Sequence, residues 1–157
     1  MKVKLIIIGK TKSKFLVDGE AEYLKRLKHY CKFSEYLIKD IKDAGRISKK
    51  ELVNKEGKLI LESIKKSEYV ILLDNNGETL SSVEFSKMLR QKISISIKEI
   101  TFVIGGAFGF SVEVYQRANS KISISKMTFS HQMVRLIFKE QLYRAYTIIK
   151  GENYHHE

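Results

Sequence analysis

Proline is absent from the 157-residue sequence, and cysteine occurs once, at Cys31. A single cysteine excludes an internal disulfide and a cysteine-rich zinc site, and it favours a reducing, cytoplasmic location. The sequence also lacks a Ser/Gly-rich linker, a low-complexity tract and an internal repeat, so nothing marks a domain boundary. We therefore expect a single domain over residues 1–157, with 43% hydrophobic residues to form its core.

Long hydrophobic runs are missing as well. No segment approaches the ~20 apolar residues that a membrane span needs, so we expect no membrane partner. Residues 1–8 place lysines before an apolar run, as a signal peptide does, but this run is shorter than the roughly 7 to 15 residues of a signal-peptide core. We interpret the run as a buried strand.

Acidic residues are scarce relative to basic ones. The chain has 29 Lys+Arg and 18 Asp+Glu, a formal net charge of +11. Residues 1–50 carry 14 basic and 6 acidic residues (+8), residues 51–100 carry 8 and 8, and residues 101–157 carry 7 and 4 (+3). This bias favours a polyanionic partner, nucleic acid first, and its alternative is a merely solvated lysine-rich surface.

Apolar runs typical of strands alternate with segments of helical period. We predict strands over 3–8, 33–41, 69–73, 101–104 and 122–125, and helices over 15–31, from 48 through 64, from 81 to about 92, over 111–118 and over 130–150. Capping-box spacing opens two of these helices, at Ser48 and Ser81, and Asn76-Gly77 indicates a turn after the third strand. The order predicts an α/β fold with a mostly parallel sheet flanked by helices.

The last predicted helix is apolar around most of its circumference, which favours burial against a second surface, most simply a partner subunit. The alternative is a central helix of a compact monomer. Arg135, Lys139 and Arg144 on this helix are candidates for phosphate contacts. Glu140 and Arg144 have the spacing of a helix ion pair, which is the structural alternative.

Two loops have ligand-binding character, and each is weak evidence alone. Residues 104–110 form a glycine-rich turn between a strand and a helix, without the spacing of a Rossmann or Walker A motif. Residues 122–132 combine small polar residues with two apolar side chains that could wall a planar ligand. A metal site finds little support, because His155 and His156 are adjacent and His131 has no second histidine one turn away.

Further motifs occur in a fixed order along the chain. They are Leu72-Leu73-Asp74 with Gly77, Ser81-Ser82-x-Glu84-Phe85, Phe102-Val103-Ile104-Gly105-Gly106-x-x-Gly109, Ile122-Ser123-Ile124-Ser125-Lys126-Met127-Thr128, His131-Gln132, Arg135, Glu140-Gln141-x-Tyr143-Arg144-Ala145, Ile148 and Tyr154-His155. Over the whole chain, this set resembles the bacterial ribosomal RNA large-subunit methyltransferase H family, pseudouridine N3-methyltransferases of the SPOUT class. One departure is Ser130, where the family usually has proline.

The resemblance implies a C-terminal trefoil knot, an exception to the rule that chains are unthreaded. It also implies a homodimer and S-adenosylmethionine as methyl donor. Carried over by position, the residues that would hold the donor are Leu73, Gly105, Gly106, Ile124, Ser125, Lys126, Met127, Thr128 and Phe129.

The implied reaction is methyl transfer to N3 of a pseudouridine in 23S ribosomal RNA of the large subunit, on the assembled ribosome. The polar candidates for catalysis are Tyr154, His155, Arg144 and Glu140, and the base among them is not assigned. In the family the C-terminal tail completes the site, and we expect Tyr154 and His155 to become ordered on substrate binding. The lysine-rich first third of the chain would then bind the ribosome.

Two alternatives from other classes remain open. One is a SPOUT-type enzyme that acts on transfer RNA. The other is a ribosome-binding or assembly protein without catalytic activity, which the donor-site motifs disfavour.

Overall fold

Five parallel strands form the centre of the computed structural model, which describes residues 1–156. The strands are β1 (Lys2–Ile8), β2 (Lys32–Ile38), β3 (Tyr69–Thr79), β4 (Glu99–Ile104) and β5 (Ser120–Ser123), in the spatial order β2-β1-β4-β3-β5. Every neighbouring pair is parallel. The predicted α/β fold is therefore confirmed, while Glu157, the last residue of the expected domain, lies outside the described residues.

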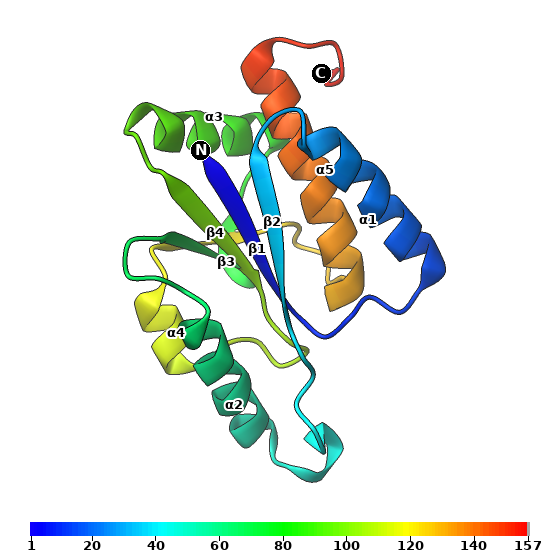
Figure 1. Cartoon of the computed structure of the whole chain (residues 1–157), viewed down its shortest axis with the longest axis vertical. Coiled ribbons are helices and arrows are strands. Elements are labelled where there is room, and N and C mark those ends of the chain that lie inside the picture. Colours follow the sequence, from blue (N-terminus) through cyan, green and yellow to red (C-terminus); the bar gives the residue numbers. More distant parts are fainter. Residues whose placement is uncertain (157) are drawn as a thin grey trace.

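Helices cover both faces of this sheet (Figure 1). They are α1 (Lys14–Leu27), α2 (Lys49–Glu62), α3 (Ser82–Ser94), α4 (Val112–Arg117) and α5 (His131–Lys150), with a short 3-10 helix at Ala44–Arg46. Figure 1 shows α1, α3 and α5 on one face and α2 and α4 on the other. Two apolar clusters result, one around Phe102 and Phe138 and the other around Ile60, Val103 and Val114.

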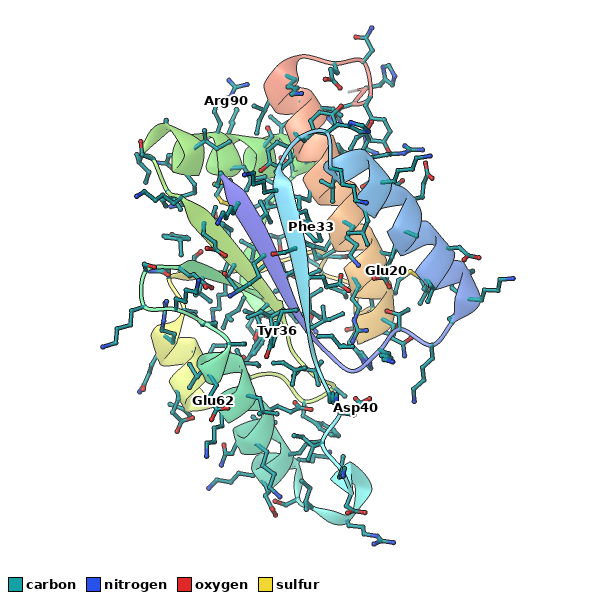
Figure 2. All side chains as sticks on the ribbon, in the orientation of Figure 1. Glu20, Phe33, Tyr36, Asp40, Glu62 and Arg90 are labelled. Carbon is teal, nitrogen blue, oxygen red and sulfur yellow. The ribbon has the colours of Figure 1, made fainter. Side chains whose placement is uncertain are left out.

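The burial of the strands follows from this three-layer arrangement. Parallel strands covered on both faces need continuous apolar sequence, as β1, the first half of β3, and β4 have. The strand β2 lies at the edge of the sheet, so Tyr36 and Leu37 remain exposed. Figure 2 shows Phe33 and Tyr36 on this outer strand.

Serine caps fix the starts of four helices, as their sequence positions indicated for two of them. Ser48 Oγ accepts from Glu51 N–H at 3.1 Å, and Ser81 forms a full capping box in which Glu84 Oε2 accepts from Ser81 N–H at 2.7 Å. Ser111 and Ser130 cap α4 and α5 in the same way. The capping predictions at Ser48 and Ser81 are confirmed.

Some element boundaries differ from the predictions. The first helix ends at Leu27 rather than at Cys31, so Cys31 is a partly buried residue of the turn before β2. The second strand ends at Ile38 rather than 41, and β5 begins and ends two residues earlier than predicted. These ends are set by neighbouring strands and helices, which periodicity alone does not contain.

The predicted end of β3 at Leu73 is wrong, because the strand continues to Thr79. Ile122 of β5 pairs with both Leu73 and Glu78, so the intervening residues form an irregular excursion within a continuing strand. At Gly77 a Cβ atom would lie 2.5 to 2.7 Å from backbone atoms of Ile122. The Asn-Gly signal therefore marks a place where two backbones approach closely, a position that only glycine fits.

The prediction that Arg135 and Lys139 contact phosphates is also wrong, because both side chains are fully buried. Arg135 Nη1 donates to the Gly9 carbonyl at 2.8 Å, and its Nη2 donates to the Ile8 carbonyl. Lys139 forms ion pairs with Glu20 and, at 2.6 Å, with Glu35. Figure 2 labels Glu20 on α1, next to α5. The helix turns these two charges inward, where Lys139 is paired with carboxylates and Arg135 donates to backbone carbonyl groups.

Candidate active site

A cleft of about 560 Å³ lies at the carboxyl ends of β3 and β4. In open α/β sheets this is the usual place for ligands. Its lining includes most of the residues that the family resemblance assigns to the donor: Leu73, Gly105, Gly106, Ile124, Ser125, Met127, Thr128 and Phe129. Lys126 belongs to the same loop as five of these residues but is not part of the lining.

The glycine-rich turn after β4 forms one wall of the cleft. Gly109 has φ +81°, a left-handed conformation that favours glycine, and its N–H donates to the Gly106 carbonyl at 3.4 Å. A Cβ at Gly105 would lie 2.9 Å from the ring of Phe110. The missing side chains therefore expose backbone to the cleft and also let the turn close on its own phenylalanine.

The buried carboxyl group of Glu56 on α2 lies under the same turn. A Cβ at Gly106 would meet Glu56 Oε2 at 2.6 Å. Burial raises the pKa of Glu56, and the nearby charge of Asp40 adds to this shift. A side chain at Gly106 would therefore press on a poorly solvated carboxyl group, which is a second reason for glycine at this position.

Tyr115 on α4 is a cleft residue that sequence reasoning missed. Its hydroxyl donates to Asp74 Oδ2, and Asp74 Oδ1 accepts from the Asn76 N–H at 2.7 Å. Burial and the hydrogen bond to Asp74 raise the pKa of Tyr115 to about 12, so the phenol keeps its proton at neutral pH. The pair fixes the β3 excursion against the cleft, and no local pattern links residues 41 positions apart.

The loop between β5 and α5 satisfies its own backbone through serines. Ser123 Oγ donates to the Ser125 carbonyl at 2.8 Å, and Ser125 Oγ accepts from Met127 N–H at 2.9 Å. Met127 and Phe129 stand exposed at the rim, at 74% and 39%. Exposed apolar side chains around a polar floor are typical of surfaces that a ligand or another protein covers.

His131 closes the cleft at the first turn of α5. Burial is the main cause that lowers its pKa, and the positive charge of Arg135 lowers it further. The imidazole is therefore neutral at pH 7. The charged and polar residues that the sequence motifs single out on this helix therefore divide: His131 lies at the cleft, and Arg135 lies inside the protein.

A second group, which we name the tail cluster, consists of Glu140, Arg144, Tyr154 and His155. Glu140 Oε1 accepts from Arg144 Nε at 3.0 Å and from the Tyr154 hydroxyl at 3.2 Å. Arg144 Nη1 lies 3.3 Å from His155 Nδ1. The predicted ion pair of Glu140 with Arg144 is confirmed, and the four candidate catalytic residues do lie together.

Electrostatics and packing hold the tail cluster in place. The hydrogen bond that Arg144 donates to Glu140 raises the pKa of Arg144, and burial, followed by the hydrogen bond with Tyr23, raises the pKa of Tyr154. The ring of Tyr154 packs edge-on against Tyr143, with centroids 4.7 Å apart. These contacts join Tyr154 to Tyr143 of α5 and to Tyr23 of α1.

The cleft residues His131 and Val134 belong to the first turn of α5, whereas Glu140 and Arg144 lie in its middle and second half, and Tyr154 and His155 follow its end; Figure 1 shows the course of this helix and of the tail after it. Val134 lines the cleft, and Arg144 follows ten residues later, about 15 Å along the helix. No member of the tail cluster lines the cleft in the part of the chain that the structure describes. One chain therefore does not bring the expected donor residues together with the expected catalytic residues.

Two features are absent from residues 1–156. No helix there combines the length and apolar character needed to cross a bilayer. No group of three or more His, Cys, Asp or Glu side chains there is arranged to hold a metal ion.

Comparison with known proteins gives a consistent result. The family model described as "Predicted SPOUT methyltransferase" matches residues 1–155. A protein of Flavobacterium psychrophilum is 52% identical over the whole of both chains, and one of Christiangramia forsetii is 51% identical over 99% of both. A Parabacteroides distasonis protein is 48% identical over full length. All three carry the name "Ribosomal RNA large subunit methyltransferase H".

Proposed function

The chain belongs to the SPOUT methyltransferase family, and from this premise we propose that it methylates N3 of a pseudouridine in 23S ribosomal RNA, with S-adenosylmethionine as donor. The observation that carries the proposal is the cleft at the carboxyl ends of β3 and β4, whose lining matches the donor residues expected from the resemblance. The family also implies that the C-terminal part of this α/β fold is knotted, in keeping with the close passage of β5 against Gly77.

The cleft suits an adenosyl ligand. Its volume of about 560 Å³ falls within the range of small-molecule sites, roughly 300 to 1,000 Å³. Gly105 and Gly106 leave backbone groups open for hydrogen bonds, while Leu73, Ile124 and Phe129 offer apolar contacts. When bound, the donor supplies a methyl group activated by a positive sulfur.

The residues of the tail cluster fit the needs of the acceptor. The N3 atom of pseudouridine carries a proton, so the site must orient the base and accept that proton. Tyr154, whose pKa is raised, keeps its proton and serves as a hydrogen-bond donor. Glu140 and His155 are the remaining acceptors, and Arg144 orients both through its guanidinium.

A homodimer would bring the two groups together. The tail cluster of one protomer would meet the cleft of its partner, since no member of the cluster lines the cleft of its own chain within residues 1–156. Half-buried apolar residues of α5, among them Leu136 and Ile137, and the exposed Met127 and Phe129 at the cleft rim support such an interface. The dimer thereby completes the active site.

The substrate in this proposal is the assembled ribosome, and the protein acts in the cytoplasm. Recognition of the ribosome depends in this proposal on the basic surface of the chain, whose basic residues are most frequent in residues 10–50. Because lysine–phosphate contacts release counterions, methylation should fall steeply as salt rises. An isolated RNA hairpin should be a poor substrate.

The test is mass spectrometry of ribosomes incubated with the protein and isotope-labelled donor. The expected result is a labelled methyl group on a pseudouridine of large-subunit RNA, and deletion of residues 153–157 should abolish the label while donor binding persists. Label on transfer RNA instead would favour the first alternative function. Ribosome binding without saturable donor binding in calorimetry would favour a non-catalytic assembly protein.

A further inference from the structure

A second groove, of about 710 Å³, lies at the amino ends of the strands, away from the donor cleft. We name it the basic groove, because its lining includes Lys2, Lys28, His29, Lys32 and Lys98. No carboxylate is part of its lining in residues 1–156. A recess lined by positively charged side chains concentrates positive electrostatic potential and attracts polyanions.

The backbone fixes the positions of these lysines. Lys2 and Lys32 face each other at the first rung of β1 and β2. Lys98 stands just before β4, where its carbonyl accepts from the Lys2 N–H at 2.9 Å. Lys28 follows the last residue of α1. Rigid elements therefore hold four flexible cationic side chains around one recess.

The four lysines are available to a partner. All are exposed, and none forms an ion pair within residues 1–156. The nearest acidic neighbour in the sheet is Glu99, which pairs with Lys2 in register. A second carboxylate, Glu152, accepts from the hydroxyl of the groove residue Tyr30. Four lysines still exceed these two carboxylates, so the groove carries a net positive charge. Lys139 differs, because its charge is paired with carboxylates inside the protein.

The basic groove continues into the tail cluster through aromatic contacts. Tyr30 lines the groove and packs edge-on against Tyr143 at 5.5 Å between centroids, and Tyr143 packs in turn against Tyr154. Lys150 Nζ lies 4.3 Å from the centroid of the Tyr30 ring, which adds a fifth lysine at this edge. The groove and the tail cluster therefore form one surface.

We infer that the basic groove binds the phosphate backbone of the RNA next to the target nucleotide, and that it serves the active site of the partner protomer. The inference rests on the proposed function, in which the tail cluster of one protomer acts at the cleft of the other. Because the groove adjoins the tail cluster, a dimer that places the tail cluster at the partner's cleft also places the groove beside that cleft. Each active site then combines the donor-binding cleft of one chain with the RNA-binding groove of the other.

The first experiment measures ribosome binding by sedimentation over a series of salt concentrations. The groove variant is Lys2→Gln/Lys28→Gln/Lys32→Gln/Lys98→Gln. A variant with the same loss of charge, Lys58→Gln/Lys65→Gln/Lys66→Gln/Lys87→Gln, alters exposed lysines outside the groove and serves as the control.

We expect the groove variant to bind ribosomes at least about tenfold more weakly at low salt, and its slope of log binding constant against log salt concentration to flatten by about 3, since each phosphate contact contributes roughly 0.7 to 0.9. The control should keep the wild-type slope, and donor affinity in calorimetry should match wild type for both. Equal slopes for the two variants would overturn the inference, as would wild-type protein that prefers anionic vesicles to ribosomes.

The second experiment tests whether the groove of one protomer acts with the cleft of the other. It uses mixed dimers, purified through two different tags. One protomer carries the groove variant and the other carries Thr128→Arg, which blocks the cleft at an exposed loop residue and spares the fold. If each groove serves the opposite cleft, the intact groove and the intact cleft lie in one site, and about half of wild-type activity remains. Activity near zero would show that each groove serves its own chain.

The two proposals can fail separately. Wild-type protein that binds ribosomes through the groove but methylates no RNA would refute the proposed function and leave the groove's phosphate binding standing. Methylation by a groove variant with unaltered ribosome affinity would refute the further inference alone.

Discussion

The carboxyl and amino ends of the sheet offer two different kinds of surface. At the carboxyl end, Gly105, Gly106 and the serine-rich loop after β5 present mainly backbone and small polar groups around a cleft. At the amino end, lysines of the basic groove and Arg144 of the tail cluster present charged side chains. Donor binding should therefore depend on close packing and little on salt concentration, whereas RNA binding should depend strongly on salt concentration.

The largest effect we expect concerns the buried cations that belong to neither surface. Lys139→Met leaves the buried carboxylate of Glu20 without its ion-pair partner and also removes the ion pair with the more exposed Glu35, and breaking a buried pair costs about 3 to 5 kcal/mol. Urea unfolding at a fixed protein concentration measures the loss. Lys126→Met, at an exposed position, is the control and should leave stability unchanged. A stable Lys139→Met protein with weaker ribosome binding would restore the phosphate role that the structure rejects.

The second effect separates chemistry from donor binding. Glu140→Gln removes the carboxylate that accepts from Arg144 and Tyr154, so we expect methyl transfer in a single turnover to slow by about 10² or more. Donor affinity in calorimetry should stay within twofold or so of wild type, because Glu140 does not line the cleft. Glu62→Gln, at an exposed position on α2, is the matched control. A large loss of donor affinity in Glu140→Gln would break the division between the two ends.

The third effect tests the close backbone passage at the carboxyl end. Gly77→Ala places a Cβ within 2.5 to 2.7 Å of the Ile122 backbone, which cannot rotate away, and we expect a loss of about 1 to 3 kcal/mol together with weaker donor binding. Gly45→Ala is the control, because nothing lies within 4 Å of its new Cβ. Thermal and urea unfolding compare the two. Equal stability of both variants would contradict the geometry at Gly77.

The smallest effect concerns the Tyr115–Asp74 pair. Tyr115→Phe removes a partly exposed hydrogen bond, so donor affinity should fall by about 1 kcal/mol. The pKa of Tyr115 rises in the folded protein to about 12, so the stabilisation should be constant at neutral pH and disappear between about pH 10 and pH 12. Calorimetry and unfolding of wild type and variant over this range measure the difference. A difference that vanishes below pH 9 would contradict the pair's role.

Local signals predicted much of the fold. The apolar runs of β1 and β4 and the serine caps of α2 and α3 appear where their sequence placed them. The signal at Asn76-Gly77 was misinterpreted as the end of a strand, because a turn and a close backbone approach both require glycine. The cleft lining was largely predicted by the family resemblance, which carries positional information that single motifs lack.

Contacts between distant residues explain what sequence reasoning missed. Tyr115 of α4 donates to Asp74 of β3, and Lys139 of α5 pairs with Glu20 and Glu35, which lie more than 100 residues earlier in the chain. The lysines of the basic groove come from three separate segments of the chain, at residues 2, 28–32 and 98. The count of charged residues shows an excess of basic residues in the first third of the chain, but a count does not distinguish solvated cations from buried ones.

The sequence by itself determined the class of fold, the helix starts and the family, because these follow from periodicity, capping and ordered motifs along one dimension. Only the tertiary structure decided which cations face water, where β5 passes Gly77, and that α5 separates the tail cluster from the cleft. The physical reason is that burial and pairing depend on residues far apart in the chain, brought together by packing of helices on both faces of the sheet.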